Sequence, residues 1–146
     1  MLRRIHLAAG AIAFLMILSF WTSTVVSELS GDLAAIAAVK AGIMWGMIVL
    51  IPALMVTGGS GFRLAGDKRL GLLGVKKRRM PFIAANGVLI LVPSAFFLCL
   101  RAEAGVFDMA FYTVQAIELL AGGVNLTLMA LNMRDGFRLT RRFANA

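Results

Sequence analysis

Lys40 and Glu118 lie further than any other ionisable residue from the ends of long apolar runs. A charge at bilayer depth costs at least about 2.5–3.5 kcal/mol, so it usually faces the protein interior and has a partner. Counted from the outer ends of their runs, the two residues differ in depth by about one helical turn, which is within reach of a lysine side chain. We therefore predict a Lys40–Glu118 ion pair. The alternatives are a Lys40 that extends towards the lipid head groups and a protonated, hydrogen-bonded Glu118.

A stripe of polar residues shares the run of Glu118. Asn125 and Asn132 follow it at intervals of seven residues, and Gln115 and Gly122 lie on the same helical face. This spacing keeps the stripe along one side of a helix that packs with left-handed crossing. The amides can line a path for protons or solutes, or they can hydrogen-bond neighbouring helices together. The second role is the commoner one.

Three further features predict how the helices pack. Asn86, one turn into the third run, is a plausible partner for Asn125 or Asn132. Pro52 and Pro93 predict bends in the second and third runs. Small residues recur at every fourth position of the second run, which lets helix backbones approach closely. This ladder predicts an internal seam of the bundle, with an oligomer interface as the alternative, and consists of Ala34, Ala38, Gly42 and Gly46.

The sequence offers little for a cofactor or for catalysis. His6 is the only histidine, so it can bind haem b only together with a methionine or with His6 of a second copy. A histidine near the lipid head groups is the simpler interpretation. The single cysteine, Cys99, lies in an apolar run and is typical of a small buried residue. Because no Ser/His/Asp set, carboxylate pair or metal-spaced cluster is present, we expect no enzymatic activity, no metal site and no cofactor other than a possible haem.

The composition indicates a membrane protein. The 146 residues are 60% hydrophobic and only 15% charged, whereas soluble domains are about 45–50% apolar and about 25% charged. Four runs reach the roughly 20 residues that a helix needs to cross a bilayer: residues 5–26, 33–57, 82–100 and 107–133. Backbone groups in lipid must be satisfied within each run, which predicts four transmembrane helices. The first run is longer than the roughly 7–15 residues of a signal-peptide core, so we expect it to be retained.

The distribution of basic residues predicts the orientation. All 15 lysines and arginines except Lys40 and Arg101 lie in the two terminal segments or between the second and third runs. Cytoplasmic flanks carry such an excess, so both termini are expected in the cytoplasm. One basic cluster directly precedes the third run, where we expect contact with anionic inner-leaflet lipids rather than nucleic acid. It consists of Lys76, Lys77, Arg78 and Arg79.

The two halves of the chain resemble each other. A shift of 75 residues places Arg3-Arg4 on Arg78-Arg79, and Gly61-Phe62-Arg63-Leu64 on Gly136-Phe137-Arg138-Leu139, without a gap. We therefore predict an all-α membrane protein with one integral membrane domain, residues 1–146, built from repeats of about 1–71 and 76–146. Its four transmembrane helices would form a bundle of two parallel-repeated helical hairpins.

In its overall pattern the chain resembles the small four-span inner-membrane proteins of Gram-negative bacteria, which implies a location in the bacterial inner (cytoplasmic) membrane. It is also similar in architecture to small multidrug exporters, although their intramembrane glutamate lies in the first span and their chains are shorter. We expect an accessory or assembly subunit of a membrane complex, or a homo-oligomer. The alternatives are a small secondary transporter that uses Glu118 and Lys40, and a haem-binding redox subunit that uses His6.

Overall fold

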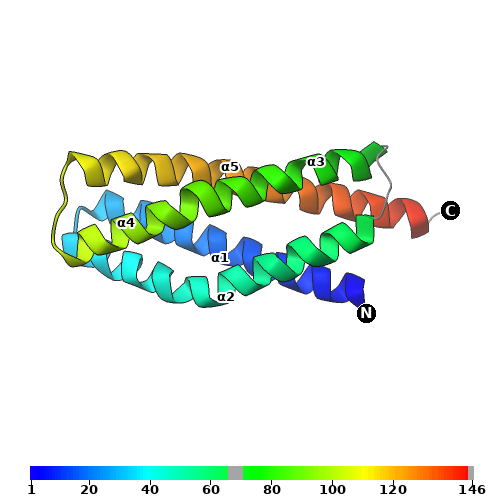
Figure 1. Cartoon of the computed structure of the whole chain (residues 1–146), viewed down its shortest axis with the longest axis horizontal. Helices are drawn as coiled ribbons and strands as arrows, with labels where there is room; N and C mark the ends of the chain where they lie inside the picture. The colour runs from blue at the N-terminus through cyan, green and yellow to red at the C-terminus, as the bar shows by residue number, and fades with distance from the viewer. Residues whose placement is uncertain (66–70, 145–146) are drawn as a thin grey trace.

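The computed structural model describes the backbone of residues 1–65 and 71–144 and the side chains of residues 1–64 and 78–137. The first two long helices are α1 (Leu2–Ser30) and α2 (Leu33–Ala65). A third arm runs continuously through α3 (Gly71–Asn86), the π-helical segment η1 (Gly87–Leu91) and α4 (Val92–Glu103), and the fourth is α5 (Met109–Ala144). The arms alternate in direction, and both termini lie at the same end of the bundle (Figure 1).

Short turns close the end opposite the termini. Gly31 and Gly105 adopt φ of +69° and +68°, a left-handed conformation that glycine enters without strain and that ends α1 and α4. An aspartate then starts each following helix: Asp32 accepts the Ala34 N–H at 3.0 Å, and Asp108 accepts the Phe111 N–H at 3.0 Å. The Phe111 N–H, together with the Arg101 guanidinium at 2.8 Å, lowers the pKa of Asp108 below its ordinary value.

The prolines explain the irregular helices. Pro93 has no N–H, and in a regular α-helix its ring would clash with the carbonyl four residues earlier. The chain avoids this clash by widening the preceding turn into η1, where the Val92 N–H donates to the Gly87 carbonyl. Pro52 lies inside α2, which changes direction along its length (Figure 1). Both bends fall in the runs where the sequence predicts them.

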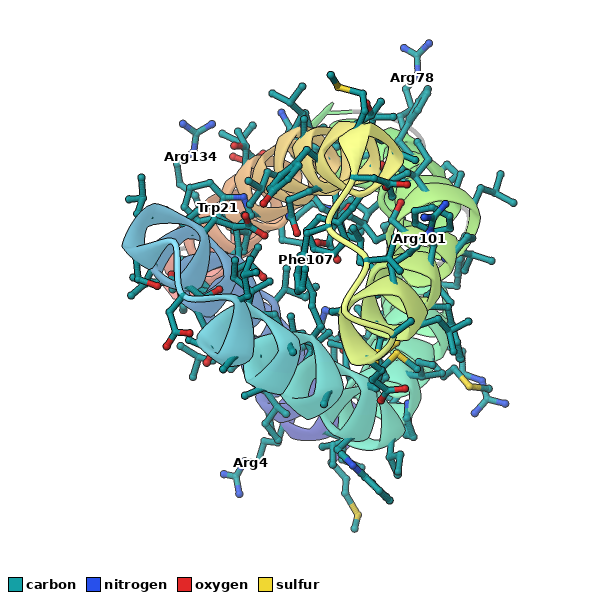
Figure 2. All side chains as sticks on the ribbon, turned by 90° about the vertical axis from the view of Figure 1, so that its left-hand side faces the viewer. Arg4, Trp21, Arg78, Arg101, Phe107 and Arg134 are labelled. Carbon is teal, nitrogen blue, oxygen red and sulfur yellow. The ribbon has the colours of Figure 1, made fainter. Side chains whose placement is uncertain are left out.

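Helix packing gives a ring with two diagonals. In the described part of the chain, α1 packs against α2 and α5, and the third arm also packs against α2 and α5. No Cα atom of α2 approaches one of α5 within 8 Å, so these two helices lie diagonally opposite each other. Figure 2 shows the ring from the end opposite the termini, with Phe107 pointing to its centre and Arg4, Arg78 and Arg134 projecting outwards.

The polarity of the bundle is reversed relative to a soluble protein. Its surface carries large apolar side chains such as Trp45, Leu89 and Leu120, each at least 72% exposed, while its interior holds Lys40 and Asn125, each at most 2% exposed. Four helical segments are long and apolar enough to cross a membrane: Leu2–Ser30, Leu33–Leu64, Arg78–Glu103 and Met109–Phe137. All four exceed the apolar runs of the sequence, because the helices continue into their polar flanks.

The small-residue ladder of α2 does not form the predicted internal seam. Ala34, Ala38 and Gly42 are exposed, so the prediction is wrong for these three residues. A residue at every fourth position drifts around a helix of 3.6 residues per turn. The interior face of α2 is instead followed by buried residues that include Ile36, Lys40, Ile43, Met47 and Leu50. Only Gly46 makes a close contact, with the ring of Phe20.

This difference predicts opposite effects for two neighbouring glycines. A Cβ at position 46 would lie 2.8 Å from Cε1 of Phe20, whereas a Cβ at position 42 would meet nothing within 4 Å. Gly46→Ala should therefore lower the free energy of unfolding by about 1–3 kcal/mol through overpacking. Gly42→Ala should leave it unchanged or raise it by up to about 1 kcal/mol. Thermal unfolding in detergent measures both, and equal effects would contradict this packing.

Candidate functional site

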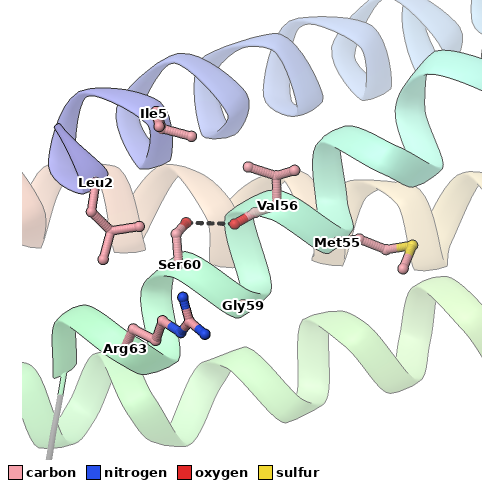
Figure 3. Close-up of a pocket in the computed structure, with 7 residues that line it drawn as sticks. All are labelled: Leu2, Ile5, Met55, Val56, Gly59, Ser60 and Arg63. Atoms are coloured by element: carbon pink, nitrogen blue, oxygen red, sulfur yellow. Dashed lines mark hydrogen bonds between the residues drawn. The ribbon is translucent and has the colours of Figure 1, made fainter.

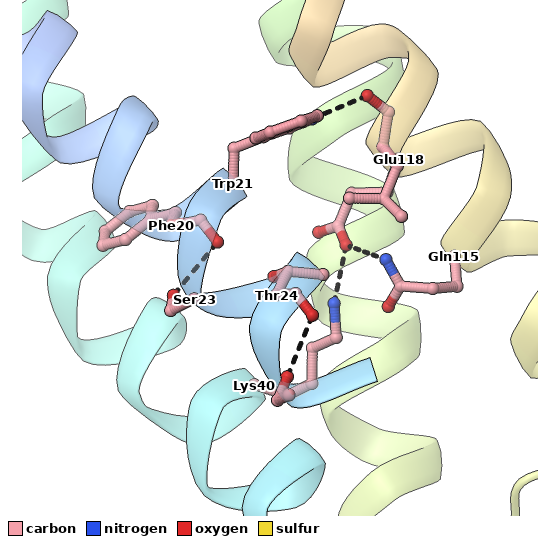
Figure 4. Close-up of polar contacts among 9 residues, drawn as sticks. Phe20, Trp21, Ser23, Thr24, Lys40, Gln115 and Glu118 are labelled. Atoms are coloured by element: carbon pink, nitrogen blue, oxygen red, sulfur yellow. Dashed lines mark hydrogen bonds and ion pairs between the residues drawn. The ribbon is translucent and has the colours of Figure 1, made fainter. Parts of the chain in front are cut away.

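An ion pair crosses the centre of the bundle. Lys40 of α2 is 2% exposed, and its Nζ lies 2.7 Å from Oε2 of Glu118 on α5 (Figure 4). The Lys40–Glu118 ion pair predicted from the sequence is thus present in the structure, and Lys40 points inwards. Gln115 Nε2 donates to the same glutamate oxygen at 3.1 Å. Because α2 and α5 lie on a diagonal, the lysine side chain spans the gap between two helices whose backbones do not meet.

Glu28 adds a third ionisable side chain, which sequence reasoning missed because it lies beyond the apolar run that ends at Val26. The helix α1 continues to Ser30 and therefore includes Glu28. It lies within electrostatic range of both Lys40 and Glu118. Its Oε1 is buried and accepts no hydrogen bond from any described residue. The centre therefore holds one lysine and two carboxylates, the second of which has an oxygen free.

Trp21 covers this centre from α1. Its indole Nε1–H donates to the backbone carbonyl of Leu119 at 2.9 Å, directly beside Glu118 (Figure 4). The ring lies against Gly122, where an added Cβ would come within 2.9 Å of Trp21 Cδ1. Only a residue without a side chain leaves room for the indole, which explains why a glycine occupies position 122 of the polar stripe. This hydrogen bond joins α1 to α5 at the level of the ion pair.

The polar stripe of α5 faces the interior, as its spacing predicts. Gln115 is 3% exposed and Asn125 is 1% exposed. The side-chain carbonyl oxygens of Gln115, Asn125 and Asn132 are buried and accept no hydrogen bond from the described residues. The prediction for Asn86 is wrong: its Nδ2 donates to the backbone carbonyl of Ala121 at 2.8 Å, and it pairs with neither asparagine. The stripe therefore presents unpaired hydrogen-bond acceptors along the bundle.

A second buried carboxylate lies near the ends of the chain. Asp135, 2% exposed, accepts from Arg79 Nη1 at 2.8 Å and from Arg134 Nη2 at 3.3 Å. Because the apolar pattern ends before Asp135, sequence reasoning did not identify this residue. Of the predicted lipid contacts, Arg79 instead joins α3 to α5, and Arg78 projects outwards (Figure 2). The side chains of Lys76 and Lys77 lie outside the described residues.

His6 connects α1 to α2 at the same end. Its Nδ1 lies 3.0 Å from Ser60 Oγ and 3.1 Å from the Thr57 carbonyl oxygen. The haem hypothesis stays a prediction, which absorption spectra of the purified protein would test. Among the described residues, no group of three or more His, Cys, Asp or Glu side chains is arranged to hold a metal ion. The Cys99 thiol is buried and donates to Glu103 at 3.5 Å.

Comparison with known proteins adds no further identification, because the chain matches no family model, no curated protein and no solved structure. The fold and the candidate site themselves define the class: a multi-pass membrane protein with four apolar helices around a charged interior. The particular activity within that class is a matter for proposal.

The diagonal ion pair predicts a double-mutant result. Removing one partner leaves an uncompensated buried charge, so Lys40→Met or Glu118→Leu alone should each cost about 3–5 kcal/mol of stability. The double variant K40M/E118L removes both charges and should recover most of that loss. Unfolding of the purified protein in detergent gives the coupling energy. Additive losses in the double variant would show that the two residues do not pair.

Proposed function

We propose that this chain is a small secondary transporter in which a proton controls the partner of Lys40. The observation that carries the proposal is a buried lysine paired with Glu118 of α5, with the carboxyl group of Glu28 on α1 within electrostatic range of both. Lys40 Nζ and Gln115 Nε2 both donate to Glu118 Oε2, whereas Glu28 Oε1 has no described donor. A structural ion pair needs only two charges, so the third one supports a centre with two arrangements.

The chemistry of the exchange follows from the charges. When the Glu118 carboxylate takes a proton from the aqueous phase, it loses its charge and the Lys40 ammonium loses its counter-ion. In a low-dielectric interior an unpaired ammonium is costly, so Lys40 is drawn to the Glu28 carboxylate. The cross-link then runs from α2 to α1 instead of from α2 to α5. Release of the proton from Glu118 restores the first arrangement.

This exchange would change which helices the Lys40 side chain connects. Because α2 and α5 have no close backbone approach, the Lys40–Glu118 pair is a charged link across their diagonal. Its loss would loosen the contact between the two hairpins, which the Trp21–Leu119 hydrogen bond and the packing of α1 on α5 and of α2 on α4 would still hold together. The unpaired acceptors of Asn125 and Asn132 line the interior between this centre and the end that carries the termini. They offer binding positions to water or to a hydrogen-bond donor that enters from that end.

We also propose that the two hairpins are copies and that both termini face the cytoplasm. The excess of basic residues at the terminal end supports the orientation. Burial at the offset of 75 residues supports the duplication, because pairs of equivalent positions are buried on both α2 and α5. These pairs are Ile36 with Phe111, Lys40 with Gln115, Met47 with Gly122, Leu50 with Asn125, and Ser60 with Asp135. The equivalent helices also lie on the diagonals of the ring, as a two-fold axis along the bundle requires.

Trp21 provides a direct test of proton control, since its indole is bonded beside Glu118. In a Trp45→Phe background, Trp21 fluorescence should titrate with pH in the folded protein. Glu118→Gln should abolish the titration, because the amide stays neutral at every pH; since this variant also loses the ion pair, thermal unfolding must first show that it is folded over the pH range of the titration. Glu103→Gln is the matched control and should leave the titration intact, since Glu103 contacts Cys99 and not the centre. A titration that persists in Glu118→Gln, or its absence in the parent, would refute the proposal.

A groove on α1 favours a second candidate function, that of an oligomer or an accessory subunit of a membrane complex. The groove has a volume of about 450 Å³, and its lining includes Leu18, Ser19, Thr22 and Val26. Among the described helices, α1 packs only against α2 and α5, so this face is uncovered. Small hydroxyl residues are enriched where transmembrane helices meet. The groove therefore fits a further transmembrane helix, from a second copy or from another subunit.

Cysteine cross-linking in native membranes tests this candidate. In a Cys99→Ser background, Thr22→Cys should give a cross-linked species with the mass of a dimer or of a defined complex. Val88→Cys, at a 65% exposed position of η1, is the control and should stay monomeric. A monomeric Thr22→Cys protein would argue against a partner on α1.

A further inference from the structure

A shallow, open cavity lies between the ends of α1 and α2. Its volume is about 330 Å³, and its walls are formed by Leu2 and Ile5 of α1 and by Met55 and Val56 of α2 (Figure 3). These four side chains are 37–72% exposed. In a membrane-spanning bundle, an apolar groove on the outside is in contact with acyl chains. The groove is thus shaped and lined for a hydrocarbon chain.

A positively charged side chain, that of Arg63, lies at one end of the groove. Arg63 lies in the last turn of α2, and its side chain is placed beside Gly59 and Ser60 (Figure 3). It forms no ion pair with the acidic residues whose side chains the structure describes. The only hydroxyl of the lining, Ser60 Oγ, already donates to the Val56 carbonyl. The strongest interaction that remains open to a ligand is therefore an ion pair between an anionic group and the Arg63 guanidinium.

We propose that this groove binds one anionic phospholipid, with its phosphate at Arg63 and an acyl chain along Met55 and Val56. The position of Arg63 at the end of a membrane-spanning helix matches the depth of a lipid phosphate, and the apolar walls match the chain below it. The site is independent of the Lys40–Glu118 centre and does not rest on the proposed transport function. It also differs from the basic cluster that precedes the third arm, since Arg63 belongs to α2.

The glycines of α2 allow the groove to be filled without disturbing the helix. A Cβ at Gly59, which lines the groove, would meet nothing within 4 Å, and the same holds for the adjacent Gly58, which does not line it. Gly59→Leu should therefore occupy the space of the acyl chain, while Gly58→Leu adds the same side chain elsewhere. Arg63→Gln removes the proposed phosphate ligand. Arg134→Gln, which removes a charge that projects outwards and does not line the groove (Figure 2), is its matched control.

Native mass spectrometry of the full chain in detergent tests the site, with dioleoyl phosphatidylglycerol and dioleoyl phosphatidylcholine as probes that share their acyl chains. We expect one phosphatidylglycerol to bind more tightly than phosphatidylcholine. Arg63→Gln should weaken its binding roughly fivefold, the effect of losing one cation near the membrane surface. Gly59→Leu should displace it, while Gly58→Leu and Arg134→Gln should bind it like the parent protein. Thermal unfolding checks that all four variants remain folded.

Several outcomes would overturn the proposal. Equal weakening by Arg63→Gln and Arg134→Gln would indicate diffuse electrostatic attraction instead of a site. Equal binding of the two lipids, which both carry a phosphate, would show that the net negative charge of the headgroup is not recognised, and an unchanged Gly59→Leu would place the lipid elsewhere. Occupation of the groove by oleate in preference to phosphatidylglycerol, or by a second copy of the chain, would exclude a phospholipid as the occupant.

Discussion

The organisation of this bundle depends on one buried lysine. A charge in the interior of a membrane protein is tolerated only when a counter-charge reaches it, and the partner of Lys40 lies on the diagonally opposite helix. This requirement sets the rotation of both helices. α2 must turn Lys40 inwards, and α5 must turn Glu118 and Gln115 towards it. The apolar remainder of each helix is then free to face lipid.

Polar contacts at two levels connect the helices. Beside the ion pair, Trp21 joins α1 to α5 at the Leu119 carbonyl, and Asn86 joins the third arm to α5 at the Ala121 carbonyl. Near the chain ends, His6 joins α1 to α2 and Arg79 joins the third arm to α5. Lipid is as apolar as leucine, so hydrophobic burial gives transmembrane helices little preference for one packing over another. Directional hydrogen bonds supply that preference here. The interior is consequently polar where a soluble protein of this size would be apolar.

Some polar residues of the interior could be predicted from the sequence, and others could not. Lys40, Glu118 and the polar stripe stand out because a charge or an amide within an apolar run is costly and therefore informative. Glu28 and Asp135 were missed because each lies just beyond an apolar run, where acidic residues are ordinary in loops. Helix length decided their role, since α1 and α5 continue past the hydrophobic pattern and carry both carboxylates into the bundle. The apolar pattern marks the hydrocarbon layer, but it does not mark where a helix ends.

The sequence by itself determined the class of protein, the number of spans, the positions of the proline bends and the polar face of α5. Each of these follows from local composition or from helical periodicity, which neighbouring helices do not alter. Only the tertiary structure decided which helices are neighbours and which are diagonal. It therefore decided that Asn86 bonds to a backbone carbonyl, that Ala34, Ala38 and Gly42 face outwards, and that Glu28 joins the charged centre. The physical reason is that the rotation of a helix about its axis is set by contacts across the bundle.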